Sequence, residues 1–148
     1  MPWIQITREP IDPTLVSDHV DREGCGALVT FSGTVRGKSH GKAVLYLEYE
    51  AYLALAEAEL GRVVQEAETN FGVRAAVQHR IGRVFPGESS ILVAAASPHR
   101  ASAFDACRWI MDTIKTSVPI WKREHHSEGV DWIEGDTAVP AIILRPIS

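Results

Sequence analysis

The segment 89–97, SSILVAAAS, most limits how this chain can fold. From Ile91 to Ala96 its side chains are apolar at every position rather than at alternate ones. Successive side chains of a strand point to opposite faces of a sheet, so a strand with this pattern is covered on both faces. The sequence therefore predicts a sheet with this strand in its interior.

The elements around this strand alternate in an α/β manner. Two long amphipathic helices are predicted, one over about residues 51–71 with Gly72 as its C-cap, and one capped by Ser97 with Pro98 at its first position. Their expected buried faces comprise Leu53, Ala56, Leu60, Val63, Ala67 and Phe71 in the first helix, and Phe104, Cys107, Met111 and Ile114 in the second. Further strands are expected over 3–8, 25–35, 43–50 and 73–84, with Leu45, Leu47 and Tyr49 on one face of the third, and a brief helix over 12–20.

Composition narrows the classes of function. The 148 residues, 45% of them hydrophobic and 23% charged, fit a single domain over 1–148. No apolar run approaches the roughly 20 residues that span a bilayer, and no signal peptide begins the chain, so a cytoplasmic protein without a membrane partner is expected. A formal net charge of −4 argues against general nucleic-acid binding. Scattered histidines and two separated cysteines predict no metal site, and no nucleotide-binding glycine motif indicates a cofactor.

Two lysines flank the end of the second long helix. Lys115 falls in the expected last turn, Pro119 ends the helix, and Lys122 follows it. The stiff or apolar residues at 119–121 can shield these amines from water, and desolvation or a neighbouring like charge lowers an amine pKa. A lysine in such a pocket can act as a general base or nucleophile. A lysine in a last turn also has a simpler role, because it stabilises the helix dipole.

Other cations define a candidate anion site. His99 and Arg100 lie at the start of the second helix, where free N–H groups favour an anion, although they are equally compatible with ordinary exposed first-turn residues. Arg36 begins a basic loop over 36–42 that contains no acidic residue. From the residues alone, the sequence indicates a small α/β protein with a basic, partly apolar pocket for a small anion.

Several motifs also resemble the large, catalytic subunit of molybdopterin synthase. They cover about residues 24–124 in order and comprise Gly33-Thr34-Val35-Arg36, Leu47-Glu48-Tyr49-Glu50-Ala51-Tyr52, His79-Arg80-Ile81-Gly82, Gly87-Glu88, His99-Arg100 with Ala103-Phe104, and Asp112, Lys115 and Pro119-Ile120-Trp121-Lys122. The fold that this resemblance implies is α/β, with a hammerhead-like core and an additional small β subdomain.

The activity implied by the resemblance is sulfur transfer. Proteins of this family convert cyclic pyranopterin monophosphate to molybdopterin by forming a dithiolene, and their sulfur arrives as a thiocarboxylate on the C-terminal Gly-Gly of a small ubiquitin-like partner. Lys115 and Lys122 match the family's active-site lysines, and Arg36, His99 and Arg100 match its anion-binding positions. The resemblance also implies a homodimer within a heterotetramer, in which a neighbouring subunit can complete each pocket.

Two other classes of function stay open at this point. A non-catalytic phosphate- or nucleotide-binding module would use the same cations for binding without turnover. A scaffold subunit would use Lys115 and Lys122 for stability alone. Substitution of either lysine distinguishes these classes from an enzyme, because only an enzyme loses turnover per folded molecule.

Overall fold

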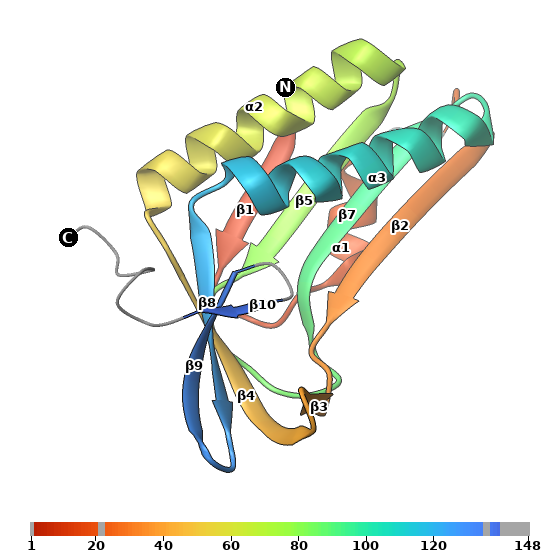
Figure 1. The fold of residues 1–148 in the computed structure, drawn as a ribbon. Helices are drawn as coiled ribbons and strands as arrows, with labels where there is room; N and C mark the ends of the chain where they lie inside the picture. Colours follow the sequence, from red (N-terminus) through yellow and green to blue (C-terminus); the bar gives the residue numbers. More distant parts are fainter. Residues whose placement is uncertain (1, 21–22, 135–136, 140–148) are drawn as a thin grey trace.

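Within residues 2–20, 23–134 and 137–139, which the computed structural model describes, the chain forms three helices and two β-sheets (Figure 1). The first sheet has the strand order β1-β5-β7-β2. Its strands are β1 (Trp3–Thr7), β2 (Ala27–Thr34), β5 (Arg74–Arg80) and β7 (Ser89–Ser97). β1 and β5 are parallel, whereas β7 is antiparallel to both β5 and β2. This mixed architecture confirms the predicted α/β class.

Helices cover both faces of the first sheet. α2 (Leu53–Phe71) and α3 (Arg100–Ser117) lie side by side over one face, and the short α1 (Pro13–Asp18) lies against the other (Figure 1). Alternate residues of β7 supply the two cores: Ile91, Val93 and Ala95 pack toward α2 and α3, and Leu92, Ala94 and Ala96 pack with Val16 and Val20. The uniformly apolar pattern thus arises from cover on both sides, and the prediction of an interior strand is confirmed.

A second sheet extends from the end of the first. Its main order is β10-β9-β8-β4-β3, and β6 also pairs with β4. These strands are β3 (Lys38–Ser39), β4 (Lys42–Ala51), β6 (Gly82–Val84), β8 (Ile120–His126), β9 (Gly129–Glu134) and β10 (Thr137–Val139). The single strand expected over 73–84 is therefore wrong, because the chain breaks at Ile81 and passes from one sheet to the other. The basic segment 36–42, expected as a loop, includes the short β3.

Three local predictions about side chains and caps are also wrong. Leu45 is 53% exposed, since a bulge between Val44 and Tyr46 interrupts the alternation of β4. Phe104 is 59% exposed, because α3 buries the face formed by Ala103, Ala106, Cys107, Ile110 and Ile114. The N-cap of α3 is His99 rather than Ser97, which ends β7 and whose hydroxyl donates to the carbonyl of His99.

The long helix α2 follows its prediction more closely. Ala56, Leu60, Val63 and Ala67 are fully buried, and Gly72 ends the helix in the left-handed conformation at φ 66°. Leu53, at the first position, is 47% exposed. No helix in the described part of the chain is both long and apolar enough to cross a membrane.

Candidate active site

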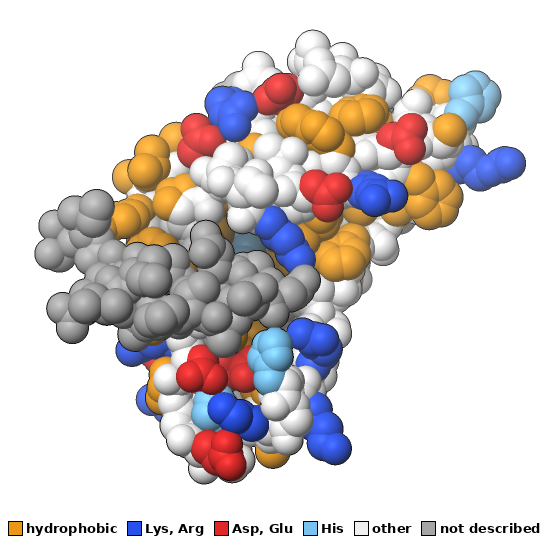
Figure 2. Space-filling model, viewed as in Figure 1, with side chains coloured by type: hydrophobic (Ala, Val, Ile, Leu, Met, Phe, Trp, Pro, Cys, Tyr) orange, Lys and Arg blue, Asp and Glu red, His pale blue; other side chains and the backbone are white. Residues whose placement is uncertain are grey.

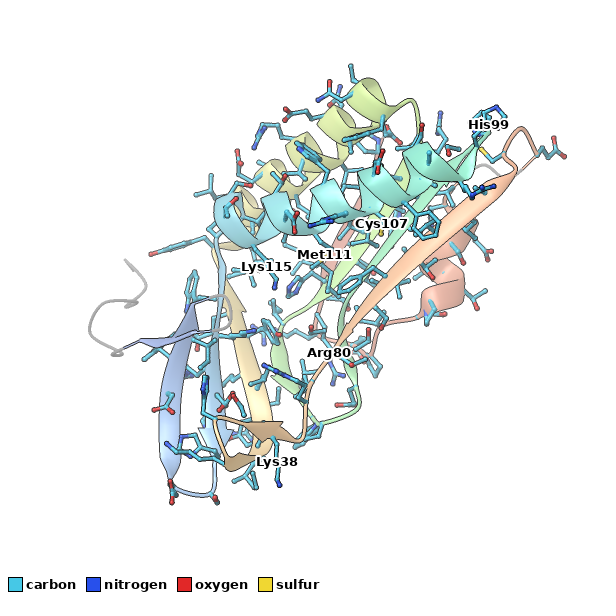
Figure 3. All side chains as sticks on the ribbon, turned by 45° about the vertical axis from the view of Figure 1, so that its right-hand side comes forward. Lys38, Arg80, His99, Cys107, Met111 and Lys115 are labelled. Atoms are coloured by element: carbon cyan, nitrogen blue, oxygen red, sulfur yellow. The ribbon has the colours of Figure 1, made fainter. Side chains whose placement is uncertain are left out.

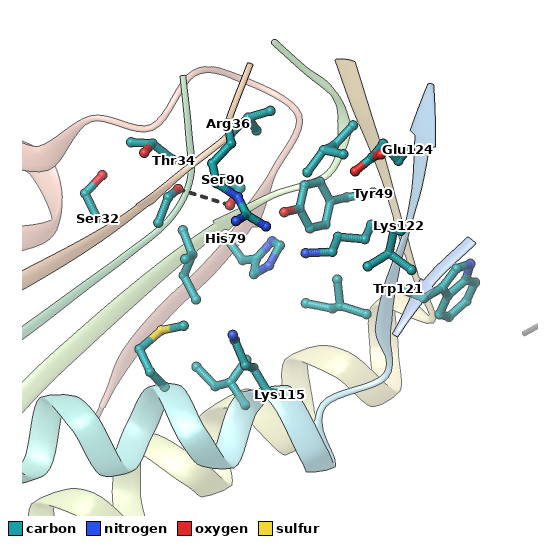
Figure 4. Close-up of a pocket in the computed structure, with 18 of the residues that line it drawn as sticks. Ser32, Thr34, Arg36, Tyr49, His79, Ser90, Lys115, Trp121, Lys122 and Glu124 are labelled. Atoms are coloured by element: carbon teal, nitrogen blue, oxygen red, sulfur yellow. Dashed lines mark hydrogen bonds between the residues drawn. The ribbon is translucent and has the colours of Figure 1, made fainter. Parts of the chain in front are cut away.

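A cavity of about 450 Å³ opens where the second sheet meets the first sheet and the end of α3 (Figure 4). Its lining comes from α3 and from strands of both sheets that lie far apart in the sequence, namely β2, β3, β4, β5, β7, β8 and β9. Aromatic and aliphatic groups such as Phe31, Met111 and Trp121 form part of the wall. The cavity therefore combines apolar surface with polar groups from many elements, as ligand sites commonly do.

Both predicted lysines line this cavity. Lys115 is exposed in the last turn of α3 and points toward the cavity in Figure 4, one turn after the lining residue Met111. Lys122 is half-buried on β8, opposite Tyr49 of β4, and its Nζ lies 6.0 Å from the centre of the Tyr49 ring. The turn at Pro119 thus brings the amines of a helix and a strand to one cavity.

Arg36 also lines the cavity, two residues after the end of β2. Hydroxyl groups surround this end: Ser32 and Thr34 precede Arg36 on β2, and Ser90 lines the same wall from β7. The Ser90 hydroxyl donates to the carbonyl of Gly33 at 3.1 Å, which ties β7 to β2 beside the arginine. A guanidinium next to hydroxyl groups can bind a phosphate or carboxylate.

His99 and Arg100 do not line this cavity. They lie at the opposite end of α3 from Lys115, and both are exposed (Figure 3). Fifteen residues separate Arg100 from Lys115, which corresponds to about 22 Å along a helix. The structure therefore brings together three of the five predicted site residues within one chain.

His79 and Tyr49 also line the cavity, although neither was predicted to be a site residue. His79, on β5, is buried, and its Nδ1 lies 2.8 Å from the carbonyl oxygen of Arg80. Burial, and secondarily the charge of Lys122, lower the pKa of His79 to about 4, although the Arg80 carbonyl opposes this change. Burial also raises the pKa of the Tyr49 phenol. The signal available in the sequence was a histidine at the end of an apolar strand.

A polar network beside the cavity fixes β8 against β4. Arg123 Nη2 donates to Glu48 Oε1 and Glu50 Oε1, each at 2.8 Å, and Trp121 Nε1 donates to Glu50 Oε2 at 3.3 Å. Neighbouring His125 contacts Glu48 Oε1 at 3.0 Å. These contacts hold the strand that carries Lys122 in a fixed register.

No thiol is available at the cavity wall formed by the described residues. Cys107 is buried under α3, where desolvation raises its pKa to about 11, and half-buried Cys25 packs in the core beside α1. Neither residue lines the cavity. Among the residues that the structure describes, no group of three His, Cys, Asp or Glu side chains is placed to hold a metal ion. The chemistry of this site therefore centres on two amines and a guanidinium.

The fold and the site together define a two-sheet α/β protein with a cavity lined by three cationic side chains, and comparison with known proteins identifies the family. The family described as "MoaE protein" matches residues 6–117. A molybdopterin synthase catalytic subunit from Thermoplasma volcanium is 46% identical over 123 residues, which cover 82% of this chain and 90% of that protein. This chain belongs to the MoaE protein family, as its motifs predicted.

Solved structures show the same fold. Molybdopterin synthase from Staphylococcus aureus superposes with a TM-score of 0.86 at 36% identity, and the match covers 90% of this chain and 98% of that one. A chain from the complex of subunits 1 and 2 of molybdopterin-converting factor from Helicobacter pylori has a TM-score of 0.70 at 20% identity, covering 90% and 92%.

Proposed function

We propose that this chain is the catalytic subunit of a molybdopterin synthase, an enzyme of molybdenum cofactor biosynthesis. Its substrate is cyclic pyranopterin monophosphate, and its product carries two new sulfurs as a dithiolene. The placement of Lys115, Lys122 and Arg36 around one cavity of about 450 Å³ carries this proposal. Family membership and the names of its relatives support the same activity.

The cationic groups have complementary roles in this reaction. Arg36 binds the phosphate of the substrate, since its guanidinium lies among hydroxyl groups at one end of the cavity. One lysine moves protons or stabilises the charged intermediate, and the other contacts the thiocarboxylate of the sulfur donor. Each transfer converts one donor thiocarboxylate to a carboxylate, and water supplies the oxygen that replaces the sulfur.

The sulfur donor is a small ubiquitin-like protein with a C-terminal Gly-Gly thiocarboxylate. An extended tail suits this cavity because it is open to solvent and partly apolar. Neither cysteine lines the cavity, and this suits a reaction in which the sulfur comes from outside the chain. We place this reaction in the cytoplasm, where the sequence predicts the protein to reside.

A second copy of the chain completes each cavity. β2 lies at the edge of its sheet, and its residues Leu28 and Phe31 are 39% and 40% exposed, while Phe104 of the neighbouring α3 is 59% exposed. Figure 2 shows hydrophobic side chains at the surface next to Lys and Arg side chains on this view of the molecule. Covering such apolar groups is favourable, and it suits a contact between two copies.

The direction of α3 explains how His99 and Arg100 join the site. α3 and β2 both run toward the cavity from the end of the molecule that carries His99 (Figures 1 and 3). A two-fold axis beside them places the start of one α3 near the end of the other. His99 and Arg100 of each copy then reach the cavity of its partner, giving a homodimer that binds one donor at each end as a heterotetramer.

Reconstitution with variants tests this function. Purified chain, thiocarboxylated donor and cyclic pyranopterin monophosphate should yield dithiolene product, and Lys115→Ala or Lys122→Ala should abolish or sharply slow its formation while the variants stay folded. Arg62→Ala is the control for removal of a cation, because Arg62 is exposed on α2 and lies outside the cavity lining. Wild-type turnover in both lysine variants would refute the proposed roles. Binding of substrate without turnover by the wild type would instead indicate a phosphate-binding module.

A further inference from the structure

His79 is the buried histidine of the cavity wall, and the proposed function gives it no role. Its side chain is on β5, and the residue is only 5% exposed. In Figure 4 its ring lies among the guanidinium of Arg36 and the amines of Lys115 and Lys122, and Lys122 points toward it. A buried group surrounded by the reactive cations is well placed to control one of them.

The hydrogen bond of Nδ1 fixes the form of the ring. The Arg80 carbonyl, 2.8 Å from Nδ1, can only accept a hydrogen bond, so Nδ1 carries the proton. In the neutral imidazole, Nε2 then has a free lone pair and acts as an acceptor. His79 can therefore receive an N–H group from the cavity without taking up a proton.

The surroundings of His79 keep it neutral near pH 7. The charged groups lining the cavity within the described residues are the cations Arg36, Lys115 and Lys122, together with the Glu124 carboxylate of β8. Uncharged polar groups on the same wall include Tyr49 from β4 and Ser90 from β7. Burial and the Lys122 charge lower the pKa of His79 to about 4. A protonated ring would also repel the neighbouring ammonium.

Tyr49 connects the histidine to Lys122. The Tyr49 and His79 rings meet edge to face, with centres 5.3 Å apart and planes at 70°. Lys122 is the strand partner of Tyr49, and its Nζ lies 6.0 Å from the same ring. One aromatic ring thus packs against the imidazole and lies beside the amine, which limits the directions that the lysine side chain can take.

We propose that His79 is a positioning residue for Lys122, whose ammonium donates a hydrogen bond to the lone pair of His79 Nε2. The ring holds the amine in the cavity in the orientation that sulfur transfer requires, and Tyr49 keeps the two groups together. This inference rests on the proposed function, because it takes Lys122 as a catalytic group.

Two isosteric variants separate this role from a purely structural one. Asparagine places its amide near the position of Nδ1, so His79→Asn keeps the donor to Arg80 but loses the acceptor at Nε2. Glutamine reaches the position of Nε2, so His79→Gln keeps that acceptor. With thiocarboxylated donor and cyclic pyranopterin monophosphate, His79→Asn should lower kcat by about tenfold to a hundredfold with KM little changed. His79→Gln should restore kcat to within about threefold of wild type.

Two results would overturn the proposal. One is wild-type kcat in folded His79→Asn, and the other is a loss of tenfold or more in folded His79→Gln. A loss of tenfold or more in folded His79→Gln would refute the proposal even if thermal unfolding shows that His79→Asn does not fold. Absence of dithiolene product with the wild-type chain would refute the proposed function, and full activity of Lys122→Ala would refute the catalytic role of this lysine on which the inference rests. An inactive Lys122→Ala with fully active His79→Asn would refute only the role of His79.

Discussion

Acidification should destabilise the folded chain through His79. Its pKa is about 4 in the folded state and 6.5 ordinarily, so between these values the unfolded chain binds a proton that the folded chain does not. The contribution of the neutral ring to the free energy of unfolding is therefore complete above pH 6.5, falls as the pH decreases toward 4, and is constant below that. The two values differ by about 2.5, which corresponds to about 3 kcal/mol. This is a large part of the 5–15 kcal/mol of a typical domain.

Urea unfolding at a series of pH values measures this contribution. Carboxylates also titrate as the pH falls, so the informative quantity is the difference in slope between wild type and His79→Gln. The variant should lose less stability than wild type between pH 6.5 and 4, by about 3 kcal/mol. His40→Gln, which changes an exposed histidine, is the matched control for the loss of an imidazole. Equal slopes in wild type and His79→Gln would refute the reasoning, because they would mean that His79 titrates alike in both states.

Three other predictions concern the anion site, the dimer and the core. Arg36→Ala should raise KM for the pterin substrate by about tenfold or more with a smaller change in kcat, and unchanged substrate affinity by calorimetry would exclude Arg36 from the anion site. Lys122→Ala and Arg100→Ala should each be inactive, but mixing and re-forming the dimers should restore about one quarter of the sites, because half the dimers then carry one intact site. No recovery in dimers shown to have exchanged would contradict a site shared between chains. Leu60→Ala should lower the free energy of unfolding by about 2–5 kcal/mol, since Leu60 is fully buried on the inner face of α2. A loss below about 1 kcal/mol would contradict this packing.

The parts of the fold that sequence could predict are those fixed by local patterns. The apolar run of β7 predicted an interior strand, and the spacing of Ala56, Leu60 and Val63 predicted the buried face of α2. A bulge depends on the partner strand, however, so the alternation of β4 alone placed Leu45 on the wrong face. Local patterns likewise gave no sign that the chain changes sheets at Ile81, because that change depends on the pairing of β6 with β4.

The candidate site likewise contains residues that local sequence patterns could predict and residues that only the tertiary fold brings to the cavity. The pattern of Lys115, Pro119 and Lys122 predicted two amines near one turn, and both line the cavity. Arg100 was predicted to belong to the same site because it lies at the start of the helix that ends near Lys115, yet the length of α3 separates it from the cavity within one chain. His79 lies 36 residues before Lys115 in the sequence and reaches the cavity only through the pairing of β5 in the first sheet. No spacing rule along the chain connects such positions.

The most direct test of sulfur transfer is to count the donor molecules consumed for each product formed. Mass spectrometry of the small donor after reaction with this chain and cyclic pyranopterin monophosphate follows the conversion of thiocarboxylate to carboxylate, while the dithiolene product is measured in the same sample. The account predicts two donors converted for each dithiolene, with Lys115→Ala and Lys122→Ala blocking both signals together. Donor conversion without dithiolene, or dithiolene formed at the same rate without the chain, would contradict it.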